Sequence, residues 1–424
     1  MAQQKMWTIL VWIAGDNNLT DYGVADLAEL KQVGSTANVD LVAQYDRGGR
    51  IGAKRYHLHK GTTLDQDEVA DLGDSNTGDP AVAIDFFTWG IDSFPAEKIM
   101  CVLWNHGSGI DETDIYARAR HLTGRATTDV RGGRQRAASH GQIELTRKQA
   151  RSIASSRLSR ALFSTTVDQA VFDKGIAYDD TSRDFLDNVE LAHVLNTVAK
   201  TTRRPIDIVG FDACLMNLIE VAYELRPYAA TMVGSEETEP ADGWPYRDVA
   251  KAAGAAAAKT PGGFAAAIVK SYLAYYKNSS EQTVTQSALD LSKVESVARA
   301  VDQLAATLTT SLQAIDEYAA FSRALTAAQR FELRDFVDLG DLCRQLAKRS
   351  GDQETIDRSN AVISTLTGRD GAVLASRTKG NAVAAATGAA IYFPTAGDVN
   401  LVYDRLAFAK DTRWPQLIER YRSF

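Results

Sequence analysis

The sequence predicts an α/β protein in which helices cover both faces of a mainly parallel sheet. Two observations favour this fold class. Short apolar runs alternate with segments of helical spacing along the first half of the chain, which is typical of β-α-β units. The chain has 424 residues, of which 45% are hydrophobic and 24% charged, as in an ordinary globular protein with a large core. In such a fold, functional residues follow the carboxyl ends of strands.

Strands are predicted at apolar, β-branched runs, namely residues 7–14, 39–45, 99–104, 206–211, 231–234, 283–291 and 389–393. Helices are predicted around Leu27 and at residues 79–89, 187–200, 264–276 and 294–312. Asp79 is a preferred N-cap residue, and Pro80 fits the first helical turn. We expect the Ala-rich, helical part beyond residue 255 to form a subdomain that braces the sheet.

Charge and cysteine content exclude several classes of protein. The net charge of −7 argues against general nucleic-acid binding, and no stretch is long enough to span a membrane. The three cysteines, Cys101, Cys214 and Cys343, predict no disulfide framework and no CxxC metal pair. We interpret residues 7–14 as a buried strand, since no signal-peptide cleavage site follows, and so expect a cytoplasmic protein. Secretion stays open if a leader has been trimmed.

Cys214 is the best placed nucleophile in the chain. It follows the predicted strand 206–211, and apolar residues recur at helical spacing from Leu215 to Leu225, before Pro227. A cysteine between a strand and a helix faces oriented backbone N–H groups, which favour the thiolate. The alternative is a small buried hydrophobic residue, which is the usual state of a lone cysteine.

His106 occupies the matching position after the predicted strand 99–104, within Asn105-His106-Gly107. It is the one histidine of six with a glycine neighbour after a buried strand, although a structural loop histidine is the alternative. His106-Gly107-Ser108-Gly109 is similar to an oxyanion loop of esterases, but the chain has no GxSxG elbow. A serine hydrolase of that fold would therefore lack its nucleophile. No nucleotide-binding glycine motif is present either.

Together these motifs resemble the clostripain family of clan CD cysteine peptidases, relatives of caspases, legumain and gingipain. The resemblance covers nearly the whole chain except roughly residues 113–175, and it rests on residues 7–19, 76–80, 105–107, 212–216, 235–246 and 390–394. It implies a caspase-like α/β/α sandwich with a mainly parallel central sheet, a His106–Cys214 dyad and endopeptidase activity after basic residues.

The chemistry of these residues agrees with that resemblance. Cys214 would attack the scissile carbonyl and form an acyl-enzyme, which divides amide hydrolysis into two easier steps. His106 would protonate the departing amine and then activate water. The backbone N–H groups of Gly107 and Cys214 are candidate oxyanion donors, because glycine lets the backbone approach the substrate.

Two acids are candidates for substrate recognition. Asp212 lies two residues before Cys214, so strand alternation places both side chains on one face. The resemblance places Asp212 and Asp242 at the floor of the P1 pocket, which implies protein or peptide substrates with Arg, and less well Lys, at P1. The alternatives are a helix-cap acid for Asp212 and a turn residue for Asp242. We expect neither nucleic acid nor membrane as a partner.

The sequence demands no cofactor. Glu236, Glu237 and Glu239 form an acidic run, which is either solvated or holds a calcium ion, since some members of the resembled family respond to calcium. No EF-hand spacing supports a calcium site.

A basic segment separates the two predicted catalytic residues. Its candidate cleavage sites are Arg118, Arg120, Arg125, Arg131, Arg134, Arg136, Arg147, Lys148, Arg151, Arg157 and Arg160. A loop of this length is functional or disordered, and a solvated linker or an anion-binding arm is the alternative. Because members of the resembled family are cut between the histidine and the cysteine, the resemblance implies a proenzyme that is activated by its own cleavage or by an upstream protease.

The predicted organisation has four parts. Residues 1–112 form the first part of the catalytic domain with His106, and residues 113–178 form the Arg-rich activation linker. Residues 179–254 complete the catalytic core with Cys214, and residues 255–424 form the bracing subdomain. Two other functions stay open, an inactive peptidase-fold binding or regulatory protein and a clan CD transpeptidase or ligase. The intact Cys214, His106 and Gly107 argue against the first of these.

Overall fold

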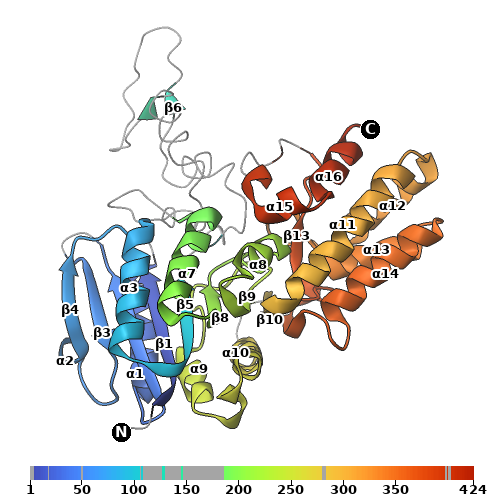
Figure 1. Cartoon of the computed structure of the whole chain (residues 1–424). Coiled ribbons are helices and arrows are strands. Elements are labelled where there is room, and N and C mark those ends of the chain that lie inside the picture. Colours follow the sequence, from blue (N-terminus) through green and yellow to red (C-terminus); the bar gives the residue numbers. More distant parts are fainter. Residues whose placement is uncertain are drawn as a thin grey trace.

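A nine-stranded sheet forms the centre of the molecule (Figure 1). The computed structural model describes residues 4–17, 19–48, 51–105, 107, 127–128, 145–146, 186–278, 283–396, 399 and 403–424. The strands of the sheet are β1 (Lys5–Ala14), β2 (Val39–Asp46), β3 (Ala53–His57), β4 (Glu68–Gly73), β5 (Ala96–Trp104), β8 (Ile206–Asp212), β9 (Ala229–Gly234), β10 (Val284–Asp290) and β12 (Val373–Lys379). Their order in space is β12-β10-β9-β8-β5-β1-β2-β3-β4.

The five central strands run parallel, and antiparallel strands form both edges. β1 pairs in parallel with β2 and β5, β5 with β8, and β8 with β9. β3 and β4 extend one edge, and β10 and β12 the other, all in antiparallel pairs. The pairing of β5 with β8 sets Trp104 opposite Asp212. The carboxyl ends of these two strands, which the sequence predicted to carry the chemistry, are therefore neighbours.

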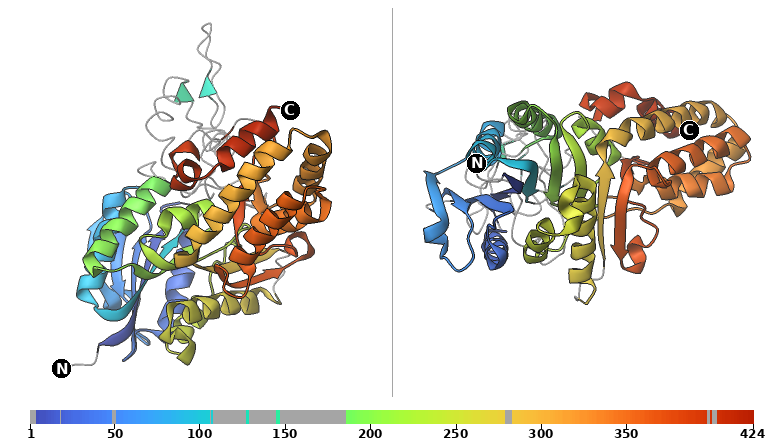
Figure 2. Two further views of the ribbon diagram at one scale, coloured as in Figure 1. Left: turned by 45° about the vertical axis from the view of Figure 1, so that its right-hand side comes forward. Right: turned by 60° about the horizontal axis from the view of Figure 1, so that its bottom comes forward.

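Helices cover both faces of the sheet, as the two views of Figure 2 show. One layer consists of α1 (Thr20–Val33), α9 (Tyr246–Ala253) and α10 (Pro261–Tyr276). The other consists of α3 (Pro80–Ser93), α7 (Asn188–Thr202) and α8 (Ile219–Leu225). Leu27 packs with the first layer and Phe86 with the second, each in its own apolar core. The α/β/α sandwich predicted from the sequence is confirmed.

The C-terminal part is rich in helices, as predicted, and lies beside one end of the sheet (Figure 1). Its helices are α11 (Val294–Ser311), α12 (Ile315–Ala327), α13 (Leu339–Arg349), α14 (Gln353–Thr367), α15 (Ala407–Asp411) and α16 (Trp414–Arg422). β11 (Phe336–Asp338) and β13 (Ala390–Tyr392) pair antiparallel beside them. However, α10, β10 and β12 belong to the sandwich, so the sheet continues past the division expected after residue 254.

The remaining described elements are short. They are α2 (Leu64–Asp67), the 3₁₀ turns Ala256–Lys259, Leu291–Lys293, Asn381–Val383 and Tyr403–Arg405, and a parallel pair of β6 (Thr127–Thr128) and β7 (Leu145–Thr146). Within the described part of the chain, no helix has both the length and the apolar composition needed to cross a membrane.

A local sequence signal explains the start of α3, whereas a distant contact sets the start of α8. The Asp79 side chain accepts a hydrogen bond from the Ala81 N–H at 2.9 Å, and Pro80 occupies the first turn of α3, as expected. The helix expected from Leu215 is wrong, because α8 begins only at Ile219. Leu215 has a φ of 62°, a left-handed conformation, and its N–H donates to Glu237 O at 3.2 Å. A tertiary hydrogen bond thus replaces the first helical turn.

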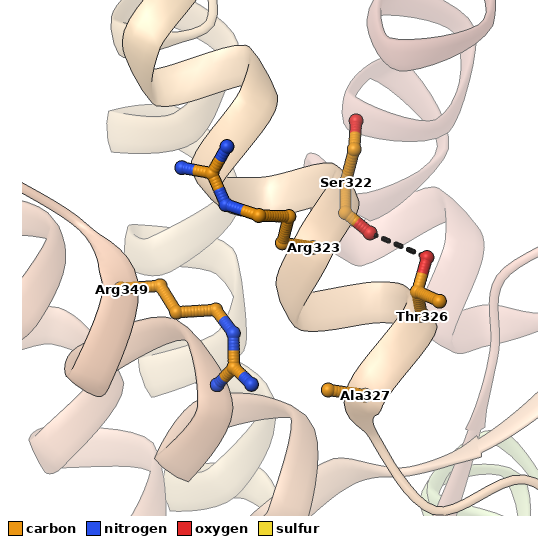
Figure 3. Close-up of a pocket in the computed structure, with 5 residues that line it drawn as sticks. All are labelled: Ser322, Arg323, Thr326, Ala327 and Arg349. Atoms are coloured by element: carbon orange, nitrogen blue, oxygen red, sulfur yellow. Dashed lines mark hydrogen bonds between the residues drawn. The ribbon is translucent and has the colours of Figure 1, made fainter.

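A cavity of about 380 Å³ lies in the C-terminal subdomain (Figure 3). It is lined by Ser322, Arg323, Thr326 and Ala327 of α12 and by Arg349 of α13. None of the predicted site residues lines this cavity. The candidate site is therefore located by the ends of the central strands, and not by this hollow.

Candidate active site

The loops that follow β5 and β8 contact each other directly. Asn105 N–H donates to Asp212 O at 3.2 Å. A side chain at Gly107 would clash with the Cys214 carbonyl oxygen and would lie 3.1 Å from the Cys214 nitrogen, so glycine is required for this close approach. His106 lies outside the described residues. Its two neighbours in the chain, Asn105 and Gly107, both lie against the Cys214 segment.

Cys214 is buried, with 4% of its surface exposed. Its Sγ accepts a hydrogen bond from Glu239 N–H at 3.2 Å, and Gly107 N–H also faces it. Burial raises the pKa of the Cys214 thiol to about 12, although these two N–H groups oppose the rise. The expectation that a helix start favours the thiolate is wrong for this structure, because burial dominates and α8 starts only at Ile219.

The segment from Cys214 to Leu218 is held from two sides. Asn217 N–H donates to Ser235 O at 2.9 Å, in the loop of residues 235–239 that follows β9, which we call the active-site loop. On the other side, Ala390 N–H of β13 donates to Asn217 O at 3.0 Å, and the Asn217 amide donates to Gly388 O at 2.6 Å. The left-handed Leu215 persists because these contacts fix the backbone on both sides of it.

Asp212 is a buried acid beside Cys214. Its carboxylate accepts a hydrogen bond from Trp244 N–H at 3.3 Å. It does not cap the helix that follows, because the N-cap position of α8 is Leu218. The Glu239 carboxyl group lies within hydrogen-bonding reach of the Asp212 carboxyl group. Burial raises the pKa of Asp212 to about 6. Burial, and then the charge of Asp212, raise the pKa of Glu239 as well.

Asp242 lies close to this pair but faces solvent. Its carboxylate accepts a hydrogen bond from Tyr275 OH at 3.3 Å. The next residue, Gly243, has a φ of 57°, and a side chain there would lie 2.8 Å from Asp212 Oδ1. Asp242 therefore occupies a turn at the edge of the site, whereas Asp212 is inside it.

A model of the clostripain family matches residues 11–123 and 164–421 of the chain. The chain belongs to the clostripain family. The match covers the strands and loops described above, and it leaves out most of the basic segment that the resemblance also failed to cover.

A curated member of the family is similar to part of the chain at low sequence identity. Clostripain from Hathewaya histolytica is 25% identical over 266 residues, which are 56% of this chain and 40% of that protein. The chain thus spans two fifths of the length of this curated relative.

Two solved structures cover almost the whole chain. A secreted C11 cysteine protease from Bacteroides thetaiotaomicron, in complex with an irreversible peptide inhibitor, has a TM-score of 0.62 at 18% identity and covers 99% of this chain and 100% of its own. An inactive zymogen C11 protease from Parabacteroides distasonis has a TM-score of 0.62 at 18% identity, with 97% of this chain and 99% of its own covered. The caspase-like fold expected from the resemblance is thereby confirmed.

Within this family framework, the structure adds an acid that sequence reasoning missed. Asp26 of α1 is buried, and its carboxylate accepts a hydrogen bond from Trp104 Nε1 at 2.6 Å. Burial, and then the charge of Asp212, raise the pKa of Asp26. The signal in the sequence was its position on the buried face of α1, at helical spacing from Gly23 and Leu30.

The three glutamates of the active-site loop point to three different partners. Glu236 faces Asp338, Glu237 accepts a hydrogen bond from Glu332 N–H at 3.2 Å, and Glu239 faces Asp212. All three are buried, so the interpretation as a solvated acidic run is wrong. In the part of the chain that the structure describes, no group of three His, Cys, Asp or Glu side chains is arranged to hold a metal ion. A calcium requirement stays a prediction.

The candidate cleavage residues, from Arg118 to Arg160 and including Lys148, lie outside the described residues. The chain on either side of them is described. β5 ends at Trp104 and α7 begins at Asn188.

Proposed function

We propose that the protein is a cysteine endopeptidase that cleaves after Arg, and less well after Lys, through a His106–Cys214 dyad. The observation that carries this proposal is the direct contact between Gly107 and Cys214, at the ends of two paired parallel strands. It brings a thiol and the loop of a candidate general base to one edge of the sheet, where α/β enzymes hold their substrates.

The proposed reaction uses these groups in order. Cys214 attacks the scissile carbonyl, and the oxyanion accepts hydrogen bonds from the N–H groups of Gly107 and Cys214. His106 gives a proton to the leaving amine and then takes one from the water that hydrolyses the acyl-enzyme. The absence of a Cβ at Gly107 supports this role, because the backbone there lies against Cys214.

The same proposal includes activation by cleavage. In the continuous chain the Cys214 thiol is buried, and its pKa of about 12 keeps it protonated at neutral pH, which fits a proenzyme. We propose cleavage between Arg118 and Arg160, by the protein itself or by an upstream protease. Pairing of β5 with β8 would hold the two fragments together. The relative from Parabacteroides distasonis is described as an inactive zymogen.

The proposed substrates are proteins or peptides with a basic P1 residue. The buried Asp212 beside Cys214 supports this preference, because a desolvated carboxylate favours a cationic side chain. The cytoplasmic location stays a prediction, and the relative from Bacteroides thetaiotaomicron is described as secreted.

The test compares wild type with Cys214→Ala and His106→Ala on a peptide library, with products identified by mass spectrometry. We expect wild-type cleavage after Arg, and loss of cleavage in both variants with an unchanged circular dichroism spectrum. If either variant keeps near-wild-type turnover, the dyad is wrong. If wild type cleaves mainly after neutral residues, the P1 assignment is wrong. Linker fragments in wild type, but not in Cys214→Ala, would identify self-cleavage.

A further inference from the structure

The Asp212 and Glu239 carboxyl groups form a buried pair without a cationic partner. Their side chains come from different parts of the chain, the end of β8 and the active-site loop, and both residues are less than one tenth exposed. Among the residues that the structure describes, no Lys, Arg or His forms an ion pair with either carboxyl group. Two such groups side by side cannot both ionise readily, so they share one proton.

Further polar atoms near this pair also lack hydrogen-bond partners. Glu239 Oε2, Gln286 Oε1 and Tyr272 OH form no hydrogen bond of normal geometry, although the Trp244 indole N–H lies near the Glu239 carboxyl group. Gln286 belongs to the same cluster, because its amide donates to Glu239 Oε1 at 3.3 Å. Tyr272 lies close enough to Glu239 and Asp212 for their charges to raise its pKa, after burial itself. Buried polar atoms in a native fold are normally satisfied, so this cluster is built to receive donors from a ligand.

A guanidinium group fits these atoms better than an ammonium group. It is planar, carries five N–H donors in a fixed fork and stays charged, so one group can bridge Asp212 and Glu239 and still reach Gln286 Oε1. The three donors of an ammonium group radiate from a single point. The neighbouring side chains Trp244 and Tyr272 are aromatic, and guanidinium groups stack well on such surfaces.

Glu239 also contacts the nucleophile. Its backbone N–H donates to Cys214 Sγ at 3.2 Å, while its side chain faces Asp212. The same residue thus contacts the Cys214 thiol through its backbone and Asp212 through its side chain. Binding of a ligand at the Glu239 carboxyl group can therefore affect the position of the N–H that bonds to the thiol. Asp242, in contrast, is exposed and hydrogen-bonded to Tyr275.

We propose that Glu239 is a specificity-determining residue, which together with Asp212 binds the guanidinium group of a P1 arginine and links occupancy of that site to the Cys214 thiol. This inference rests on the proposed function and adds a residue to it. Before binding, the two carboxyl groups hold one proton between them. When the guanidinium group enters, that proton passes to solvent, and two carboxylates face one cation.

Proton release predicts a pH dependence for arginine substrates. Within the described residues, the groups that face the pair are Asp26 of α1, Trp244, Tyr246 of α9, Tyr272 and Tyr276 of α10, Gln286 of β10, and Cys214. None of these groups is cationic. We therefore expect kcat/KM for arginine substrates to rise with pH through the titration of the pair, and the pKa of about 6 for Asp212 places part of that rise in the weakly acidic range.

The experiment uses cleaved, active protein and three peptides that differ only at P1, carrying Arg, Lys or citrulline, the neutral isostere of Arg. Glu239→Gln keeps the shape of the side chain and removes its charge. We expect kcat/KM for the Arg peptide to fall by roughly 30-fold or more, because an uncompensated charged contact is lost in a buried site. The ratio of Arg to citrulline cleavage should fall with it, and the pH-dependent rise should shrink.

Glu237→Gln is the matched control, because this neighbouring buried carboxylate binds Glu332 N–H and not Asp212. It should keep the ratio of Arg to citrulline cleavage. If Glu239→Gln misfolds, Glu239→Asp keeps the charge but draws it back by one methylene, and the ratio should fall to an intermediate value.

The outcomes separate this inference from the proposed function. A wild type that does not prefer Arg to citrulline overturns the proposed P1 preference. A wild type that prefers Arg, with Glu239 variants that keep both the preference and the pH profile, overturns only the role of Glu239. Cys214→Ala, with its linker cut by added protease, is then titrated with agmatine by calorimetry in two buffers. Release of a proton on binding supports the inference, and binding without proton release contradicts it.

Discussion

Two pairs of buried carboxyl groups begin on the same active-site loop, but they have different surroundings. Glu239 faces Asp212 in the sandwich, next to Cys214. Glu236 faces Asp338 at the start of α13, in the C-terminal subdomain. Burial, and then the partner acid, raise the pKa of both glutamates.

The difference lies in how the partner acid is satisfied. Asp338 accepts hydrogen bonds from Asp341 N–H at 2.6 Å, from Thr387 N–H at 2.5 Å and from the Thr387 hydroxyl at 2.8 Å, so it caps α13 and fixes a loop. Asp212 accepts one backbone hydrogen bond, from Trp244, and its other polar contacts are the Tyr246 hydroxyl and the Glu239 carboxyl group. The two glutamates do not differ in this way, because neither Glu236 carboxyl oxygen has a hydrogen-bond partner of normal geometry, and Glu239 Oε2 has none either. The difference is that the fold fixes Asp338 through both of its oxygens, whereas Asp212 keeps capacity to bind a ligand.

Each pair also has a buried cysteine beside it, which allows the largest expected effect to be measured. Cleavage of the linker should raise the alkylation rate of Cys214 by about 1000-fold or more and leave that of Cys343 unchanged. With a pKa of about 12, fewer than about one Cys214 thiol in ten thousand is ionised near neutral pH, compared with a few per cent for an ordinary exposed thiol. Cys343 is fully buried in α13 near Asp338, far along the chain from the cut.

Iodoacetamide labelling followed by peptide mass spectrometry gives both rates in one sample. The uncut reference is a chain in which the linker arginines, Arg118 to Arg160, are replaced by glutamine, and Lys148 with them. Equal Cys214 rates before and after cleavage would remove the basis for a proenzyme.

The second prediction compares the loss of each partner acid, Asp212 in one variant and Asp338 in the other. Asp212→Ala should lower kcat/KM for arginine substrates by some tens to thousands of times, the equivalent of about 2 to 5 kcal/mol for a lost charge partner. Asp338→Ala should leave the P1 preference intact and lower the free energy of unfolding by about 2 to 4 kcal/mol, because it removes a helix cap and several buried hydrogen bonds.

Kinetics with Arg and citrulline peptides measures the P1 preference of both variants, and urea unfolding measures their stability. The comparison fails if Asp338→Ala changes the P1 preference as strongly as Asp212→Ala does. It also fails if Asp212→Ala cleaves Arg peptides as well as wild type.

The sequence located the chemistry because the relevant signals are local. The apolar runs that became β5 and β8 are followed directly by the His106 and Cys214 motifs, and parallel strands bring such ends together. The capping signal of Asp79 and Pro80 likewise depends only on neighbouring residues. These features required no knowledge of long-range contacts.

What the sequence did not predict depends on distant parts of the chain. The side chain of Glu239 faces Asp212 only because the loop after β9 folds back over the end of β8. The late start of α8 follows from the hydrogen bond between Leu215 and Glu237. A run of glutamates looks solvated unless the subdomain that buries it, through contacts such as that with Asp338, is known.

The smallest expected effect concerns the pair formed by Glu236 and Asp338. Glu236→Gln should leave stability near its wild-type value at about pH 4 and raise the free energy of unfolding by about 1 to 2 kcal/mol at about pH 8. In wild type, the folded-state pKa of Glu236 is raised, so the stability that its protonated form contributes is present below 4.5 and is lost as pH rises through the higher folded pKa. The glutamine amide donates to Asp338 at every pH, so the variant avoids that loss.

Urea unfolding of Glu236→Gln at both pH values, in a Cys214→Ala background that prevents self-digestion, measures the difference. Glu354→Gln, on the exposed surface of α14, is the control and should follow the wild-type curve at both pH values. A Glu236→Gln chain that is less stable than wild type at about pH 8 would mean that Glu236 gains more as an anion than its burial against Asp338 costs. Burial against a second acid would then not destabilise the ionised form of Glu236 as it does that of Glu239. The charge of Glu236, and not a proton shared with Asp338, would hold this end of the active-site loop.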